Sequence, residues 1–254
     1  MADAIRVHGL RKVFHRRGAA PVVALDGLSF SVPQGHIFGL LGPNGAGKTT
    51  TLRILTTLIR STAGAAEVAG IDVSRDPLAV RRRIVVVTQE SAAEIFLSVR
   101  DNLLTFARFH GLKGPALRAR VDAAMDTFGL TPEASRKAMD LSGGFRRRIQ
   151  VAKALLVDTP VVFLDEFSTG MDPILKRSVM ALLRKEAGRG RTIVLTTQIL
   201  SEAEALCDDI LIINHGREIA RGDVATIKAL STTHNATLED VFVELMQQPS
   251  GDPS

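Results

Sequence analysis

One octapeptide has the residue types and the spacing of a phosphate-binding loop. Residues 42–49 read Gly-Pro-Asn-Gly-Ala-Gly-Lys-Thr and fill every fixed position of the pattern G-x-x-x-x-G-K-[ST]. In such a loop the glycines let successive backbone N–H groups point at phosphate oxygens, and the helix that follows favours anions at its N-terminus. The lysine reaches the β- and γ-phosphates, and the next hydroxyl can ligate Mg²⁺. The pattern predicts binding of ATP or GTP, and the candidate nucleotide-binding residues are Gly42, Pro43, Asn44, Gly45, Ala46, Gly47, Lys48, Thr49 and Thr50.

Two carboxylates, Asp165 and Glu166, directly follow an apolar stretch expected to be a strand at 161–164. In a nucleotide hydrolase the first acid supports Mg²⁺, usually through water, because this ion keeps much of its hydration shell. The second can act as general base on the attacking water. Polar residues often end strands, so the pair has meaning only together with the phosphate loop. We therefore expect Thr49 and Asp165 at a metal and Lys48 and Glu166 in catalysis.

A second candidate anion site lies at Leu141-Ser142-Gly143-Gly144, just before an expected helix at 145–157. Ser142 can cap that helix, and the two glycines leave the N–H groups of its first turn accessible. A single chain does not need two phosphate sites so far apart in sequence. Two chains arranged head to tail do, because each can close the nucleotide of the other. The sequence therefore predicts a dimer with a nucleotide at its interface.

The bulk composition is that of an ordinary globular protein. The chain has 254 residues, of which 45% are hydrophobic and 23% are charged. No apolar run approaches the ~20 residues that span a bilayer, and the first residues contain no apolar signal segment, so export of the protein is not expected. The single cysteine, Cys207, excludes an internal disulfide, and we expect it to be a buried apolar residue.

The charge pattern argues against nucleic acid. The net charge is only +5, and there is no Trp or Tyr to stack on bases. Arginines cluster at 81–83 and at 146–148, each beside apolar residues at helical spacing. We interpret both clusters as solvated helix faces and expect no nucleic-acid partner.

Strand-like and helix-like segments alternate along much of the chain. Such alternation predicts parallel βαβ units in a three-layer α/β core, with a helical insertion near 90–157. We expect a nucleotide-binding domain at 1–230 and a short amphipathic helix with a tail at 231–254. The expected strands are 4–7, 22–25, 28–32, 36–41, 84–87, 161–164, 192–196 and 209–214; the expected helices are 49–58, 99–110, 117–128, 145–157, 173–187 and 201–206.

The tail carries a helix expected at 237–246. Thr237 can cap it, with Asp240 three residues later in the capping-box position. Its apolar stripe would pack on the core of this chain or, alternatively, bind a partner.

These motifs together resemble the ATP-binding cassette (ABC) family, and the resemblance runs from about residue 4 to residue 230. It implies a P-loop NTPase ABC ATPase fold, with a RecA-like parallel-sheet core, an antiparallel β subdomain and a helical subdomain. It also implies hydrolysis of ATP with Mg²⁺. By the family pattern, Gln89 would contact the Mg²⁺/γ-phosphate region and link it to a membrane subunit. Asp172 would organise the dimer interface, and Phe14 would stack on adenine, although Phe14 could also be a core residue.

Further segments are similar to the subunits of bacterial daunorubicin-type drug and antibiotic exporters. These segments are 49–64, 196–198, 201–204 and the helix at 237–246. The likeness implies a separate multi-span membrane permease and a position at the cytoplasmic face of the membrane. We expect the second ATP-binding subunit to be another copy of this chain, with a heterodimer with a paired cassette as the alternative. Phe96 and Leu97, which follow Gln89, would transmit motion to the permease or serve as core residues. A soluble ABC ATPase without transport, or a nucleotide-gated binding module, is the alternative.

Two positions depart from the family pattern. Gln198 stands where the family usually has a switch histidine that contacts the γ-phosphate. Glutamine cannot take up charge or shuttle a proton. The loss of one charge-assisted contact would cost about 1–2 kcal/mol, so we expect hydrolysis to be slow. Glutamine here is nevertheless familiar in the exporter branch, so Gln198 stays a candidate catalytic residue. Phe145 directly follows Leu141-Ser142-Gly143-Gly144, the signature segment of the family pattern, at a position where that signature commonly ends in Gln. Ser142, Gly143 and Gly144 keep the elements of an anion site.

Overall fold

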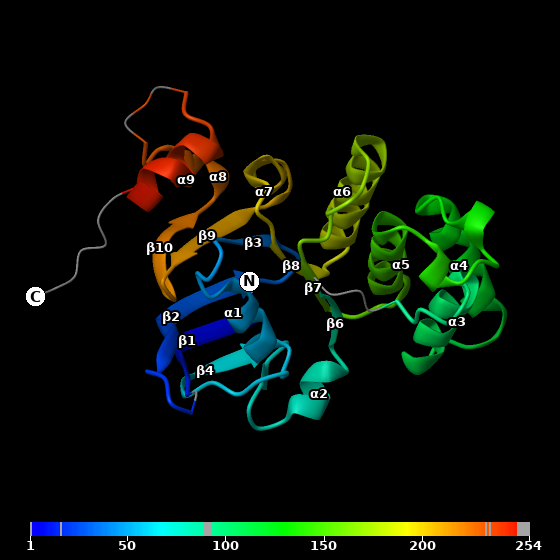
Figure 1. Cartoon of the computed structure of the whole chain (residues 1–254), viewed down its shortest axis with the longest axis horizontal. Coiled ribbons are helices and arrows are strands. Elements are labelled where there is room, and N and C mark those ends of the chain that lie inside the picture. The colour runs from blue at the N-terminus through cyan, green and yellow to red at the C-terminus, as the bar shows by residue number, and fades with distance from the viewer. Residues whose placement is uncertain (1, 16, 89–92, 232, 234, 248–254) are drawn as a thin grey trace, which may run out of the picture.

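The computed structural model describes residues 2–15, 17–88, 93–231, 233 and 235–247 (Figure 1). A six-stranded sheet in the order β10-β9-β3-β8-β7-β6 forms its middle layer. The strands from β9 to β6 are parallel, and β10 pairs antiparallel with β9. Their bounds are β3 Ile37–Leu41, β6 Ile84–Val87, β7 Val161–Asp165, β8 Thr192–Thr196, β9 Asp209–Asn214 and β10 Arg217–Gly222.

The central strands are apolar because both of their faces are covered. Every residue of β3, β7 and β8 is buried, as expected for parallel strands between two layers. Successive side chains enter different cores. Ile37 and Leu41 pack with the helices on one face, while Phe38 and Leu40 pack with the antiparallel strands on the other. The rings of Phe30 and Phe38 stack 5.4 Å apart and join the two sheets.

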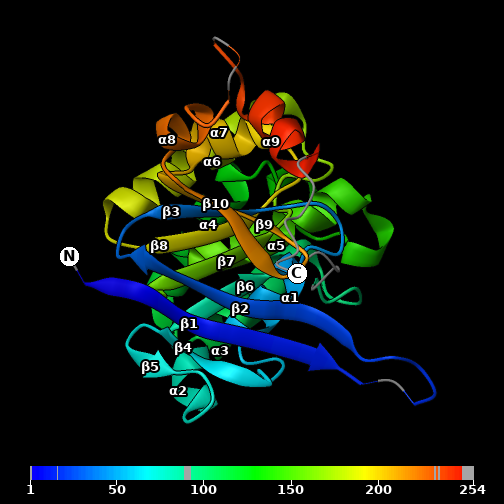
Figure 2. The same cartoon turned by 90° about the vertical axis from the view of Figure 1, so that its left-hand side faces the viewer.

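The two outer layers differ in kind (Figure 2). One contains helices α6 (Pro173–Gly188), α7 (Leu200–Leu206), α8 (Val224–Lys228) and α9 (Leu238–Gln247). The other contains helix α1 (Lys48–Leu55), the short helix α2 (Pro77–Arg81) and an antiparallel sheet in the order β2-β1-β4-β5. Its strands are β1 Asp3–Phe14, β2 Val22–Pro33, β4 Ala63–Val68 and β5 Ile71–Asp72.

Helices α3 (Val99–Phe109), α4 (Gly114–Thr127) and α5 (Gly143–Leu156) form a separate helical group, with 3-10 turns at Thr131–Glu133 and Ala138–Asp140. They lie on the side of β6 and β7 away from α1 (Figure 1). Ser98 caps α3 by accepting a hydrogen bond from the Asp101 N–H at 3.0 Å. Among the described residues, none of the helices has both the length and the apolarity needed to cross a bilayer.

The fold class is the expected one, and several element boundaries are as expected. Strands β6, β8 and β9 have the predicted bounds. By contrast, the strands expected at 22–25 and 28–32 are one strand, β2, in which Gly27 at φ 81° accommodates an irregularity of the register. Strand β10 and helix α8 were not predicted, because β10 is a mostly polar edge strand and α8 has only five residues.

The C-terminal helix packs on this chain. Leu238 and Val241 of α9 are buried, and the Leu238 N–H lies 3.4 Å from a Glu204 carboxylate oxygen of α7. The predicted capping box is present: the Asp240 N–H donates to Thr237 Oγ1 at 3.2 Å, and the Thr237 N–H donates to Asp240 Oδ2 at 2.8 Å.

Candidate nucleotide-binding and catalytic site

The phosphate loop connects the end of β3 to the start of α1, as the sequence predicted. A Cβ on Gly42 would lie 2.2 Å from the Ile213 carbonyl oxygen, and a Cβ on Gly47 would lie 2.7 Å from that of Ala24. Both glycines also have positive φ, at 154° and 110°. Gly47 begins α1 without a side-chain cap, so the N–H groups of the first turn have no side-chain acceptor there. This cradle, which only glycines can form, fits the phosphates of a nucleotide.

Lys48 places a buried cation beside that cradle. Its Nζ donates to the carbonyl oxygens of Gly42 at 2.7 Å and Pro43 at 2.9 Å, and the residue is only 8% exposed. Burial lowers the pKa of the Lys48 ammonium, while Glu166 and Asp165 act in the opposite direction. A bound phosphate would supply the counter-charge that this partly desolvated ammonium favours.

Thr49 and Asp165 line one hollow of about 190 Å³ together with Thr88. The carboxylate of Asp165 accepts a hydrogen bond from the Thr196 hydroxyl, which fixes it at the end of β7. A hydroxyl and a carboxylate are hard oxygen donors that suit Mg²⁺. Within the described part of the chain, no group of three or more His, Cys, Asp or Glu could hold a metal. The donor set fits an ion that takes its remaining ligands from water and phosphate. Gln89, the other expected metal contact, lies outside the described residues.

Glu166 is held beside the phosphate loop by Gln198. The Gln198 amide donates to Glu166 Oε1 at 2.6 Å and to Asn44 Oδ1 at 3.2 Å. The backbone of Glu166 has φ 51°, and its N–H donates to the Thr196 carbonyl at 3.0 Å. The structure therefore joins two predicted catalytic residues to the phosphate loop. The sequence did not predict these contacts, because the three residues are far apart along the chain.

The signature segment begins α5 at an exposed position. Ser142 caps the helix by accepting from the Phe145 N–H at 3.3 Å. A Cβ on Gly144 would lie 2.4 Å from the Gly170 carbonyl oxygen, whereas a Cβ on Gly143 would meet nothing within 4 Å. Gly143 and Gly144 line a hollow of about 450 Å³ with Glu166 and Gly170, which is different from the hollow at Thr49 and Asp165.

Asp172 joins the signature helix to α6. It caps α6 by accepting from the N–H groups of Ile174 at 3.1 Å and Leu175 at 2.9 Å, and it pairs with Arg148 at 2.9 Å. The Leu175 N–H is the main cause that lowers the pKa of the Asp172 carboxyl. Arg148 also lies over the ring of Phe145, 4.7 Å from its centroid. Phe145, a departure from the family pattern, thus contacts the arginine that pairs with Asp172.

Two predicted aromatic contacts are exposed. The ring of Phe14 is 37% exposed at the end of β1, with Lys12 Nζ 5.0 Å from its centroid, so Phe14 is not a core residue. Phe96 is 73% exposed, whereas Leu97 is partly buried. Phe96 is therefore available to a partner.

The interpretation of residues 146–148 as a solvated helix face is wrong for Arg147. This residue is 7% exposed and points into the chain, while the arginines at 81–83 are exposed as expected. The reason is that α5 packs on more than one face: Val151 and Ala154, four and seven residues after Arg147, are buried as well. That helical spacing was the signal in the sequence that could have placed Arg147 inside.

Sequence reasoning also missed a buried carboxylate, Glu202. Its oxygens accept from Ser168 Oγ at 2.6 and 2.8 Å and from Thr197 Oγ1 at 3.2 Å, and Lys176 Nζ lies 2.6 Å away. Glu202 thereby joins α7 to α6, to the segment after Glu166 and to the segment before Gln198. A buried carboxylate with this many partners fixes the positions of those segments. Cys207 is buried, as expected.

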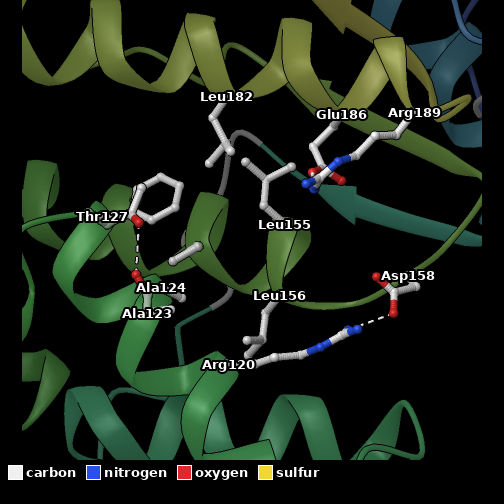
Figure 3. A pocket seen from close by; sticks show the side chains of 12 residues that line it. Arg120, Ala123, Ala124, Thr127, Leu155, Leu156, Asp158, Leu182, Glu186 and Arg189 are labelled. Atoms are coloured by element: carbon white, nitrogen blue, oxygen red, sulfur yellow. Dashed lines mark hydrogen bonds and ion pairs between the residues drawn. The ribbon is translucent and has the colours of Figure 1, made fainter. Parts of the chain in front are cut away.

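Another pocket, of about 280 Å³, lies between α4, α5 and α6 (Figure 3). Leu155, Leu156 and Leu182 line it, and Arg120 pairs with Asp158 at its edge. It contains none of the predicted site residues.

The fold and the site define an ABC-type nucleotide-binding subunit, and the comparisons agree. The chain belongs to the ABC transporter family, whose model matches residues 25–169. By this membership it is an ATP-binding subunit and an ATPase.

Several relatives are named for drug resistance or export. The chain is 42% identical over 249 residues to the doxorubicin resistance ATP-binding protein DrrA of Mycobacterium tuberculosis, covering 98% of this chain and 72% of the relative. It is 41% identical to the daunorubicin/doxorubicin resistance ATP-binding protein DrrA of Streptomyces peucetius, covering 89% and 67%. It is 44% identical to the Nod factor export ATP-binding protein I of Burkholderia pseudomallei, covering 79% and 66%.

Solved structures agree on the fold. An ATP-binding subunit of an ABC transporter superposes with a TM-score of 0.87 at 26% identity, covering 96% of this chain and all of that one (100%). The dimeric ATP-binding cassette MJ0796 bound to ADP and Pi has a TM-score of 0.80 at 23% identity, covering 86% and 98%.

Proposed function

We propose that two copies of this chain bind two Mg-ATP molecules at a shared interface and drive a separate multi-span membrane permease that exports a small molecule of the drug or antibiotic class. The observation that carries this proposal is the exposed, serine-capped start of α5. It lines a different hollow from the one that Thr49 and Asp165 line, so a second copy can place its own nucleotide against it. The names of the relatives support the export role.

The residues of the site have distinct roles in this proposal. Lys48 and the N–H groups of the phosphate loop bind the phosphates of one ATP. Ser142 and Gly144 of the second copy bind the γ-phosphate of that ATP. Thr49 and Asp165 would hold Mg²⁺, which when bound neutralises phosphate charge. Glu166 orients the attacking water as general base.

Positioning and charge stabilisation dominate phosphoryl transfer to water, so the hydrogen bonds of Gln198 matter. Gln198 keeps the Glu166 carboxylate beside Asn44 of the phosphate loop. Gln198 donates through its amide and carries no charge, and it therefore orients Glu166 without serving as a proton carrier.

ATP joins the two copies, and its hydrolysis releases them, so that the chemical step becomes a cycle of closing and opening. We place the chain at the cytoplasmic face of the membrane as a peripheral homodimer. Gln89 and the exposed Phe96 are the proposed contacts through which the permease senses this cycle.

The Glu166→Gln variant tests the ATP-dependent dimer. It should bind Mg-ATP, hydrolyse it far more slowly than the wild type and accumulate as a dimer, as measured by light scattering after size exclusion. Wild-type turnover in Glu166→Gln, or a monomer at saturating Mg-ATP, would contradict the proposal.

Membrane fractionation tests the permease. The chain should move to the membrane fraction when it is produced together with a multi-span protein from the neighbouring reading frame. Phe96→Asp should reduce this recruitment, whereas Phe109→Asp, at a position of α3 that is 85% exposed, is the matched control. A chain that stays in the supernatant in both conditions would favour a soluble ABC ATPase.

A further inference from the structure

Arg147 contacts three segments of the chain from one buried position. It lies one turn inside α5, and its guanidinium donates to the backbone carbonyl oxygens of Thr88, Asp165 and Glu166 and to Gln150 Oε1. The bond to the Glu166 carbonyl measures 2.6 Å and the bond to Gln150 measures 2.8 Å. The end of β6, the turn after β7 and the signature helix therefore meet at one side chain.

The Glu166 backbone needs such support. A non-glycine residue at φ 51° adopts a conformation that L-residues avoid, and it persists only where its surroundings fix it. The Glu166 N–H donates to Thr196 and the Glu166 carboxylate accepts from Gln198, while the Glu166 carbonyl accepts from Arg147 and, at 3.3 Å, from the Thr169 N–H. Of these contacts, only the one from Arg147 originates in the helical group.

A rigid planar guanidinium suits this task. Its five N–H donors have a fixed geometry and can bind several carbonyl oxygens at once, which an ammonium cannot reproduce. Burial lowers the pKa of Arg147, while Asp165 and Glu166 oppose this change. Arginine ionises far above neutral pH, so the charge remains.

We propose that Arg147 is a positioning residue that transmits ATP binding at the signature helix to the Glu166 of the same chain. The inference rests on the proposed dimer. There, Ser142 and Gly144 contact the nucleotide held by the other copy, while Glu166 acts on the nucleotide held by its own copy. Arg147 lies between them, so it connects the two ATP sites of the dimer through one chain.

The test compares Arg147→Met and Arg147→Lys with Arg120→Met, which removes an exposed arginine of α4. In the Mg-dependent ATPase assay, Arg147→Met should lower kcat at least about tenfold and bring the Hill coefficient for ATP from above 1 to near 1. Affinity for ATP measured without Mg²⁺ should stay within about twofold. Arg147→Lys should show an intermediate loss, and Arg120→Met should behave as wild type.

A double-mutant comparison separates positioning from general destabilisation. If Arg147 acts through Glu166, adding Arg147→Met to Glu166→Gln should change the single-turnover rate by less than about twofold. A full tenfold loss in that background would overturn the inference, and so would wild-type kcat and cooperativity in Arg147→Met. If both Arg147 variants fail to give a cooperative melt by circular dichroism, Arg147 is a structural residue and the inference fails. A wild type that neither hydrolyses ATP nor dimerises would instead refute the proposed function.

Discussion

Two helices of this chain, α1 and α5, begin with glycines, yet their N-termini are built in different ways. The start of α1 is enclosed: a Cβ on Gly42 or Gly47 would collide with the backbone of Ile213 or Ala24. The start of α5 is exposed, Ser142 caps it with its own hydroxyl, and Gly143 faces open space.

Helix N-termini of one kind can therefore be arranged to meet a ligand in two ways. A helix N-terminus attracts anions wherever it is, because its N–H groups lack partners. At α1 the chain supplies the rest of the site, including a buried lysine. At α5 the chain leaves one side open, and in the proposed dimer the other copy brings the phosphate to it.

The enclosed site at the start of α1 contains the buried charge of Lys48, and its removal should have the largest effect on ATPase activity. We expect Lys48→Ala to lower Mg-dependent ATPase activity by about 10²–10³-fold, because it removes a preorganised cation from the phosphates. Lys185→Ala, at an exposed position of α6, is the control. Phosphate release is the measurement, and activity within twofold of wild type would mean that Lys48 does not serve the phosphates.

Substitutions at the open start of α5 should lower the rate of ATP hydrolysis without weakening ATP binding. Gly144→Ala places a Cβ 2.4 Å from the Gly170 carbonyl oxygen, whereas Gly143→Ala meets no atom within 4 Å. We therefore expect Gly144→Ala to lower kcat by about 10²-fold and Gly143→Ala to do less, with equal ATP affinity in the monomer. Weakened ATP binding by the Gly144→Ala monomer would show that the two helix starts are not independent.

Gln198 lies between the two helix starts, since it bonds to Asn44 of the phosphate loop and to Glu166, which lines the hollow at Gly143 and Gly144. Gln198→Ala removes the amide that donates to Glu166 at 2.6 Å and to Asn44 at 3.2 Å. A hydrogen bond to a charged group contributes about 1.5–3 kcal/mol, so kcat should fall by at least about tenfold. ATP-dependent dimerisation should persist in light scattering. Loss of the dimer with unchanged kcat would place Gln198 at the interface instead.

The smallest effect concerns the packing of Cys207 against Gly39 of β3. Burial raises the pKa of Cys207 to about 12 from an ordinary value of 9.0. The unfolded thiol ionises as the pH rises past that ordinary value, while the folded thiol does not. The free energy of unfolding should therefore fall between pH 9 and 12, by about 1.4 kcal/mol at pH 10. Urea unfolding of the wild type and of Cys207→Ala at pH 8 and 10 measures this loss of stability. An equal decrease of the free energy of unfolding in both proteins would contradict the prediction.

Local pattern was enough for much of the fold. Apolar runs placed β7, β8 and β9 because strands covered on both faces must be apolar throughout. Periodicity placed α4 and α5, and the Thr237 and Asp240 pair placed the start of α9. Polar edge strand β10 and the short helix α8 were missed, since neither has a periodic signal long enough to recognise.

For the site, the residue types could be read from the sequence: a glycine loop, Lys48, Asp165, Glu166 and a capping Ser142, each required by its own chemistry. The contacts of Gln198 with both Glu166 and Asn44, and the buried position of Arg147, became visible in the folded chain. The physical reason is that motifs are local, whereas these contacts join the ends of strands that are distant in sequence and adjacent in the sheet. Strand order decides that Gln198 meets Glu166 and Asn44, and no spacing along the chain encodes those contacts. The helical spacing of Arg147 with Val151 and Ala154 indicated a buried face, but not which carbonyl oxygens the guanidinium reaches.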